Sequence, residues 1–246
     1  MLLNVYGDLR QLLKREFRGG DTIAHELQRK ASVKDVVESF GIPHTEVGRM
    51  LINGREITFS HIAAQNEQID IYPVSPPVDV LSPSLLRPHP LGSITFAVDD
   101  NVGKLASLLR MAGFDTCYLK SVPDSELAEV ARQEGRILLS KDKDLLKRKM
   151  ITFGRLVREV TPEKQLCEII ELYGLKQMLQ PFSRCLRCNN VLQPVEKQKI
   201  LDRLEPLTIK YYNSFYMCGR CRNIYWPGSH REKMVTTLNH CLDSHG

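Results

Sequence analysis

Four cysteines near the C-terminus have the type and spacing of a metal site. They form two Cys-x-x-Cys pairs, Cys185 with Cys188 and Cys218 with Cys221, and 29 residues separate the pairs. A Cys-x-x-Cys turn lets two thiolates reach one ion, and two such turns complete a tetrahedral Zn²⁺ site. Because four thiolates leave no open coordination position, we expect this zinc to be structural rather than catalytic. The alternative, two redox-active pairs, lacks the usual strand-then-helix setting.

Carboxylates form the second candidate site. Asp99 and Asp142 each follow a short apolar run with the pattern of a buried strand, and Asp124 opens a helical run. Ligand sites in α/β sheets lie beyond the carboxyl ends of the strands, so we expect these acids to meet at one edge. Oxygen ligands suit Mg²⁺ or Mn²⁺, which can activate water and neutralise charge at a phosphodiester. The alternative is that each Asp only caps the helix that follows it.

Four short segments between residues 94 and 142 form a recognisable pattern. They are Phe96-x-x-Asp99-x-x-x-Gly103-Lys104-Leu105-Ala106, Leu109-Arg110-x-x-Gly113-Phe114-Asp115, Asp124-x-Glu126-Leu127 and Arg136-Ile137-Leu138-Leu139-Ser140-x-Asp142. The pattern resembles the PIN-like RNase domains of the Mut-seven C-terminal family, and the resemblance runs from about residue 94 to the C-terminus. It implies an α/β fold and a metal-dependent ribonuclease with acidic site residues at Asp99, Asp124 and Asp142.

Two further acids in this stretch have an open role. The family usually has a small residue and then Met-Leu after its first Asp, whereas this chain has Asp100-Asn101-Val102. Asp100 is therefore either a further ligand or a solvated neighbour. Asp144 is similarly ambiguous, and we include it among the candidate catalytic residues.

Several cations lie near these acids in the sequence and can hold an RNA backbone beside a metal ion. The candidates are Lys104, Arg110 and Lys141, and Arg110 also matches the family pattern. A solvated helix face explains the basic run 147–149 equally well.

Aromatic residues among cations mark the C-terminal segment. Trp226 and His230 match the end of the family pattern and are our candidates for RNA contact, since aromatic rings can stack on unpaired bases. The alternative is that the aromatic residues fill the small core of a zinc ribbon.

Residues 1–75 have the order of elements of a small β-grasp domain. The phrases LINGREI and QIDIYPV resemble ubiquitin-like sulfur carriers, in which a free Gly-Gly tail performs the chemistry. Here the chain continues past Val74, so a carrier role is not expected. We expect this module either to dock a protein partner or RNA, or to act only as a stabilising element.

The remaining boundaries follow from composition and pattern. Residues 76–93 hold five prolines and are expected to form a linker, since proline removes amide donors and stiffens the chain. Residues 94–181 alternate strands and helices, which predicts a PIN-like α/β nuclease domain with a mostly parallel sheet. Residues 182–246 are expected to form the zinc ribbon and a C-terminal helix. The apolar surroundings of Cys117 and Cys167 predict buried core thiols.

Composition bounds the partners and the compartment. The chain has 246 residues, 42% of them hydrophobic, and a net charge of +5. Residues 184–246 hold ten Lys and Arg against five Asp and Glu, so the excess lies in this segment, which favours a polyanionic partner. The sequence shows no secretory signal and no apolar run long enough for a membrane helix, so we expect a cytoplasmic protein without a membrane partner.

Taken together, the sequence predicts hydrolysis of RNA phosphodiester bonds by a Mg²⁺ or Mn²⁺ site, with RNA held by a basic zinc ribbon. Transfer RNA or another structured RNA is the expected partner. Two alternatives stay open: a non-catalytic RNA-binding protein associated with tRNA or the ribosome, and an adaptor that recruits a protein partner through residues 1–75.

Overall fold

The computed structural model describes residues 1–20 and 22–243, apart from the side chains of residues 229–231, 233 and 243. It contains two compact units. The first consists of Met1–Asn101 with Leu119–Val157, and the second of Val102–Tyr118 with the chain from Arg158 onward. None of the described helices combines the length and the apolar character needed to span a bilayer.

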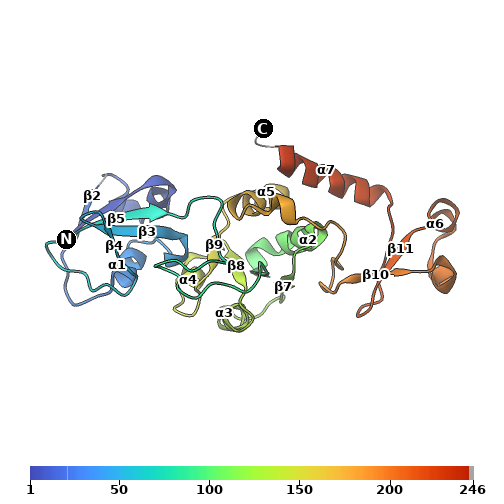
Figure 1. Ribbon diagram of the computed structural model, residues 1–246, viewed down its shortest axis with the longest axis horizontal. Coiled ribbons are helices and arrows are strands. Elements are labelled where there is room, and N and C mark those ends of the chain that lie inside the picture. Colours follow the sequence, from blue (N-terminus) through green and yellow to red (C-terminus); the bar gives the residue numbers. More distant parts are fainter. Residues whose placement is uncertain (21, 244–246) are drawn as a thin grey trace. The chain divides into compact units, whose positions relative to one another are not determined.

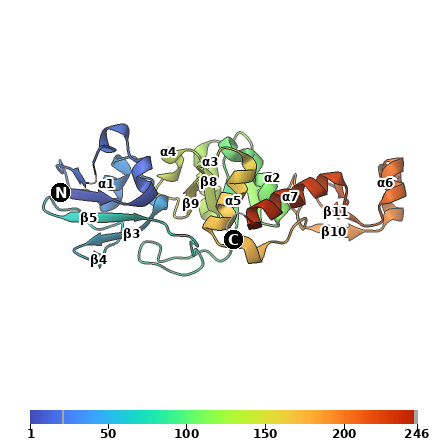
Figure 2. The same ribbon diagram turned by 90° about the horizontal axis from the view of Figure 1, so that it is seen from above.

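The first unit begins with a five-stranded sheet of order β2-β1-β5-β3-β4 (Figure 1). β1 (Leu2–Val5) pairs in parallel with β5 (Gln68–Pro73), and the other neighbours are antiparallel. The other strands are β2 (Thr22–Ala24), β3 (Val47–Ile52) and β4 (Arg55–Glu56). Helix α1 (Val33–Ser39) lies on one face of this sheet (Figure 2). This arrangement is the β-grasp, or ubiquitin-like, fold that the sequence predicts.

Ser32 begins α1 as the sequence predicts. Its hydroxyl accepts a hydrogen bond from the amide of Asp35, which satisfies one of the free donors of the first turn. Val33, Val36 and Val37 are buried on the face that packs against the sheet.

A parallel sheet follows in the same unit. β6 (Phe96–Val98) pairs with β8 (Ile137–Ser140), and β8 pairs with β9 (Gly154–Leu156). Helix α3 (Asp124–Gln133) packs against β6 and β8, and the short α4 (Lys143–Leu146) follows β8. Every residue of the three strands is buried, as expected for a parallel sheet with both faces covered. The basic run after α4, expected to be helical, lies beyond the end of the helix at Leu146.

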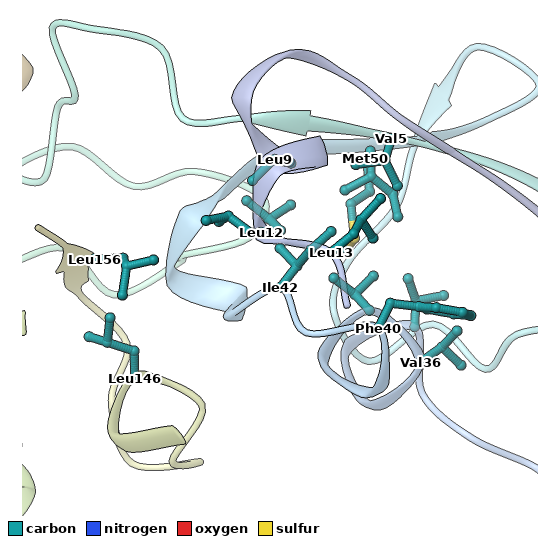
Figure 3. Close-up of a cluster of buried hydrophobic side chains, with 14 of the residues drawn as sticks. Val5, Leu9, Leu12, Leu13, Val36, Phe40, Ile42, Met50, Leu146 and Leu156 are labelled. Carbon is teal, nitrogen blue, oxygen red and sulfur yellow. The ribbon is translucent and has the colours of Figure 1, made fainter. Parts of the chain in front are cut away.

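The β-grasp sheet and the parallel sheet share one hydrophobic core. Leu146 and Leu156 lie opposite Leu9 and Leu12 in Figure 3, and all four belong to the same cluster of buried side chains. A buried ion pair accompanies this contact, since Arg155 Nη1 lies 2.8 Å from Glu46 Oε2. The β-grasp domain is therefore an integral part of the first unit.

The proline-rich segment 76–93 contains no helix or strand, yet it is fixed to the first unit. The guanidinium of Arg87 donates to the carbonyls of His44, Thr45, Val47 and Thr152. Four backbone acceptors for one side chain hold this segment in place, although its sequence has the composition of a linker.

The second unit combines helices with a small antiparallel sheet. It contains α2 (Gly103–Ala112), β7 (Thr116–Tyr118), α5 (Pro162–Leu172) and α7 (Ser229–Asp243). α5 contacts both α2 and α7. The small sheet has the order β10-β11-β12 and is formed by Leu192–Val195, Phe215–Cys218 and Ile224–Tyr225. Helix α6 (Pro206–Tyr211) lies in the insert at the far end of the β10–β11 hairpin (Figure 1).

Cys167 requires a correction to the sequence analysis. It is not a free core thiol but pairs with Cys241 as a disulfide, which joins α5 to α7 across 74 residues of sequence. Cys117 is a reduced cysteine outside this disulfide and is only partly buried.

Candidate functional site

The parallel register of β6 and β8 brings two of the predicted acids to one edge. Val98 lies beside Leu139, and the amide of Asp99 donates to the carbonyl of Leu139 at 3.0 Å. Asp99 and Ser140 are therefore neighbours at the carboxyl ends of adjacent strands, where ligand sites of α/β sheets are found.

Asp99 is the centre of a hydrogen-bond network at this edge. Its Oδ2 accepts bonds from the Ser140 hydroxyl at 2.6 Å and from the Asn101 side-chain amide at 2.5 Å. Ser140 Oγ in turn accepts the backbone amide of Asp142 at 2.8 Å, and Asn101 Oδ1 accepts the amide of Lys141 at 3.0 Å. Asp99 and Asp142 thus belong to one network, although they are 43 positions apart in the sequence.

Asp142 also caps a helix. Its Oδ1 accepts the amides of Asp144 at 2.7 Å and Leu145 at 3.4 Å, and it occupies the N-cap position of α4. The capping alternative therefore holds for this residue, while its half-buried carboxylate still lies beside the Asp99 network.

Asp124 begins α3 without capping it. Pro123 occupies the N-cap position, and Asp124 Oδ2 lies 3.9 Å from the guanidinium of Arg148. The loop before α3 is tied to the acidic edge by another residue, because Asp100 Oδ2 accepts the amide of Ser121 at 2.7 Å. This bond gives Asp100, whose role was open, a loop-anchoring contact.

The side chain of Asp144 lies outside the network around Asp99, although its amide donates to Asp142. Its side chain is 89% exposed and forms an ion pair with Lys147 at 3.1 Å, one turn along the chain. Among the described residues, only the four cysteines form a group of three or more potential ligands close enough to share an ion. The three acids therefore do not converge on one ion-sized position in this arrangement.

The candidate phosphate contacts fall into two groups. Lys104 on α2 and Lys141 after β8 both have exposed side chains. Arg110 requires a correction, because only 5% of it is exposed and its guanidinium donates to backbone carbonyls of Thr116, Leu186 and Arg187. A side chain enclosed by its own protein in this way is not available to an RNA backbone.

The four cysteines come together in the second unit. Their sulfur atoms lie within 4.8 Å of one another, with Cys185 3.4 Å from Cys221 and Cys188 3.3 Å from Cys218. Cys185 and Cys218 are buried, whereas Cys188 and Cys221 are partly exposed. Four sulfur donors in a cluster of this size suit one metal ion such as Zn²⁺.

The two Cys-x-x-Cys turns have the same backbone hydrogen bonds. In the first, the amide of Asn189 donates to the Cys185 carbonyl, and in the second the amide of Arg222 donates to the Cys218 carbonyl. Asn189 and Arg222 both adopt a left-handed conformation, with φ of 68° and 63°. The repeated geometry directs both thiols of each turn to the same point.

Charge conflict among the thiols favours a bound cation. Burial raises the pKa of Cys218, but the amide of Cys221 and the thiol of Cys188 donate to it and bring its pKa down to about 6. The amide of Asn223 lowers the pKa of Cys221, whereas burial and the neighbouring thiols raise that pKa to about 12. Adjacent thiolates repel one another, and the positive charge of a coordinated metal ion offsets this repulsion, so that all four thiols can lose their protons.

A tyrosine supports the cluster from outside. The Tyr225 hydroxyl lies 3.1 Å from the Cys185 sulfur and accepts the amide of Leu186 at 3.1 Å. Burial and the contact with Cys185 raise the pKa of Tyr225 to about 12, so its hydroxyl stays protonated and can donate to the thiolate.

The ribbon's aromatic residues divide between core and surface. Phe215 is buried and packs against Trp226 with ring centroids 6.4 Å apart, while 39% of Trp226 remains exposed. Tyr211 and Tyr216 are exposed by 64% and 44%. The backbone of His230 lies in α7, and its side chain is outside the described part of the chain.

An α/β domain with an acidic edge, a ubiquitin-like domain and a four-cysteine ribbon together define a PIN-like, nuclease-related class of protein. Comparison with family models matches residues 94–238 to the Mut7-C RNAse domain and residues 1–79 to the Mut7-C ubiquitin domain. The first match covers more than half of the chain, which therefore belongs to the Mut7-C RNAse domain family, as its resemblance predicts. Comparisons with curated proteins and with solved structures gave no match.

Proposed function

We propose that the protein is a metal-dependent ribonuclease that hydrolyses RNA phosphodiester bonds. The family match supports a nuclease-related function. The observation that carries the proposal is the 2.6 Å bond from Ser140 to Asp99, because it joins the ends of β6 and β8 and holds Asp142 in the same network.

The donors at this edge suit a hard divalent cation. Asp99 and Asp142 would hold Mg²⁺ or Mn²⁺, which prefer oxygen ligands, and Asp124 would complete the site from the start of α3. Asp124 now lies beside Arg148, so the proposal requires it to exchange that contact for the ion. When bound, such an ion neutralises charge on the phosphate and lowers the pKa of a water nucleophile.

The surrounding residues would position the acids and the substrate. Ser140 and Asn101 fix one oxygen of Asp99 and leave its Oδ1 facing the start of the next turn, where it accepts the amide of Asp100. Lys141, which follows Ser140 and is exposed, would offer its ammonium group to a phosphate beside the acids.

The ribbon would bind the RNA through charge and stacking. Its segment carries the net positive charge of the chain, and Trp226, Tyr211 and Tyr216 expose aromatic surface that can stack on unpaired bases. Lys104 on α2 is a further proposed contact with the phosphate backbone.

The test compares purified wild-type protein with the Asp99→Asn variant on single-stranded RNA and on tRNA. With Mn²⁺ or Mg²⁺ present, we expect cleavage by the wild type and at least about 100-fold slower cleavage by Asp99→Asn, the order of loss expected when one electrostatic contributor is removed. Asp35→Asn is the matched control, since Asp35 is exposed on α1 in the β-grasp domain. Equal cleavage by wild type and Asp99→Asn would contradict the proposal.

A second candidate function is RNA binding without catalysis. Two observations favour it: the three acids do not converge, and each has at least one oxygen engaged by the chain itself. This candidate predicts tight RNA binding, unaffected by Asp99→Asn, with no cleavage in any divalent metal.

The role of residues 1–75 is open to the same kind of test. The buried Glu46–Arg155 ion pair and the four bonds of Arg87 support a stabilising role for this domain. An adaptor role would instead require a protein partner on its exposed sheet face. Affinity capture with the full chain would identify such a partner. The control is a variant in which the exposed residues Tyr6 and Arg49 are both changed to Ala.

A further inference from the structure

Arg110 is a buried cation that the proposed ribonuclease chemistry does not use. It lies near the end of α2, is 5% exposed, and is surrounded by buried neighbours on the same helix. Burying an arginine is unfavourable unless its donors and its charge are matched, so its contacts indicate what it is there to hold.

The guanidinium donates hydrogen bonds to two different backbone turns. On one side, Nε and Nη2 donate to the Thr116 carbonyl at 3.0 and 2.9 Å. On the other, Nη1 donates to the carbonyls of Leu186 and Arg187, at 3.0 Å each. Leu186 and Arg187 are the two residues between Cys185 and Cys188, so Arg110 holds the first Cys-x-x-Cys turn directly.

Other side chains also link the α2–β7 turn to the Cys185–Cys188 turn. Asn189 accepts the amide of Thr116 through Oδ1 and donates to Asp115 through Nδ2, both at 3.0 Å. Arg184 donates to the Gly113 carbonyl at 3.2 Å and pairs with Asp115 at 3.3 Å. Gly113 ends α2 at φ +103°, where a side chain would also collide with the carbonyl of Gln180.

Charge gives a second reason for a cation at this position. Four thiolates around one Zn²⁺ carry a net charge of −2, and the Arg110 guanidinium touches the turn that presents two of them. The second turn, at Cys218, has no equivalent buried arginine among the described residues.

We propose that Arg110 is the positioning residue of the metal site: it fixes the Cys185–Cys188 turn on the α2–β7 turn and offsets the charge of the bound tetrathiolate. Zinc occupancy and the geometry of the end of α2 are then coupled. The inference rests on metal occupancy of the four cysteines and is independent of RNA cleavage.

The test measures zinc affinity and zinc release in the full-length protein. Arg110→Met removes the charge and the fork while keeping much of the volume, and we expect about 10- to 100-fold weaker zinc binding and correspondingly faster release to a chelator. Arg29→Met is the matched control, because Arg29 is an exposed arginine of the β-grasp domain outside the metal site, and the zinc affinity of this variant should stay near wild type.

A purely structural role is separated by comparing zinc-loaded and zinc-free protein. If Arg110 positions the metal site, Arg110→Met lowers the melting temperature of the zinc-loaded form more than that of the zinc-free form. Equal losses in the two forms, or wild-type zinc affinity in a folded variant, would overturn the proposal.

If Arg110→Met does not fold, Arg110→Lys tests whether Arg110 positions the metal site. Lysine keeps the charge but cannot bridge Thr116 and Leu186 with a planar fork, so we expect zinc affinity at least about threefold below wild type. Wild-type affinity in this variant would overturn the proposal, and so would wild-type protein that contains no zinc. Cleavage by wild type and Asp99→Asn, measured separately, reports on the ribonuclease proposal alone.

Discussion

The hydroxyl of Ser140 donates a hydrogen bond to the carboxylate of Asp99 across 2.6 Å. Ser140 is completely buried, and its oxygen also accepts the amide of Asp142. One hydroxyl therefore joins the end of β6, the end of β8 and the start of α4. Because the buried hydroxyl has both a donor and an acceptor partner, it holds these chain segments in one arrangement, which suits a site that must keep carboxylates in place.

The Ser140→Ala variant tests whether the Ser140 hydroxyl positions Asp99 for cleavage in addition to stabilising the fold. Loss of the hydroxyl leaves the Asp142 amide without its partner and should destabilise the protein by about 1–3 kcal/mol. Because Asp99 then loses one of the two side chains that fix its Oδ2, RNA cleavage should fall by about 10- to 100-fold, the usual effect of removing a partner of a metal ligand.

The measurement is kcat on RNA beside a denaturant titration, with exposed Ser107→Ala as the control for a serine that bonds neither acid. Unchanged kcat in a folded Ser140→Ala variant would mean that the Ser140 hydroxyl is not needed to position Asp99.

Two variants of Asp142 distinguish capping from chemistry. Asparagine is as good an N-cap as aspartate, so Asp142→Asn should keep the stability of α4 within about 0.5 kcal/mol while RNA cleavage falls sharply. Asp142→Ala should lose both, with a stability loss of about 1 kcal/mol. Thermal unfolding and cleavage rates are measured together, and full activity of Asp142→Asn would leave this residue as a cap alone.

The features predicted from the sequence are those encoded by neighbouring residues. Ser32 begins α1, strand-like runs form the β-grasp sheet, and Asp99 follows a buried strand because apolar periodicity and capping are local. The spacing of the two Cys-x-x-Cys turns likewise predicted their convergence, since metal ligands impose a fixed geometry.

The features missed depend on partners far away in the sequence. Nothing in the surroundings of Cys167 indicates that it pairs with Cys241, and nothing near Arg87 indicates its four carbonyl acceptors. The sequence does contain one indication that Arg110 is buried. Apolar residues, Leu109 and Met111, stand directly before and after it in α2, which is unusual for a solvated arginine. The role of Asp124 depends on where Arg148 lies, and local patterns do not contain that information.

Glu46→Ala should unfold the first unit more easily. The Glu46 carboxylate is buried, pairs with Arg155 and accepts the amide of Leu156 at 2.8 Å. Removing it breaks this buried ion pair and takes away the acceptor of the Leu156 amide, which should lower the free energy of unfolding by about 3–5 kcal/mol.

Exposed Glu56→Ala on β4 is the control, with a change expected within about 0.5 kcal/mol. Urea titration followed by circular dichroism measures both variants. A Glu46→Ala variant as stable as the control would show that the ion pair contributes nothing to joining β9 to the β-grasp domain.

Metal removal should unfold the ribbon. The hydrophobic cluster around the four cysteines is small, so most of its stability should come from the bound ion. Trp226 is the only tryptophan of the chain and packs against Phe215 of β11, so its fluorescence reports on the ribbon.

Addition of a strong zinc chelator, or Cys218→Ser, should shift Trp226 emission to longer wavelength, and elemental analysis should find one zinc per wild-type chain. Cys117→Ser, which changes a reduced cysteine outside the cluster, should keep both the zinc and the emission spectrum. Unshifted emission after complete zinc removal would argue that the ribbon folds without metal.

The Cys167–Cys241 pair should make the attachment of α7 sensitive to thiol redox state. Incubation with glutathione disulfide should yield a linked peptide containing both cysteines on non-reducing mass mapping, because the two lie side by side on α5 and α7.

Reduction, or Cys241→Ser, removes this link and should accelerate proteolysis within α7 several-fold, since the rest of that contact is a short stretch of helix packing. Cys117→Ser is again the control and should leave the cleavage rate unchanged. Two freely alkylated thiols at these positions in the oxidised protein would contradict the prediction.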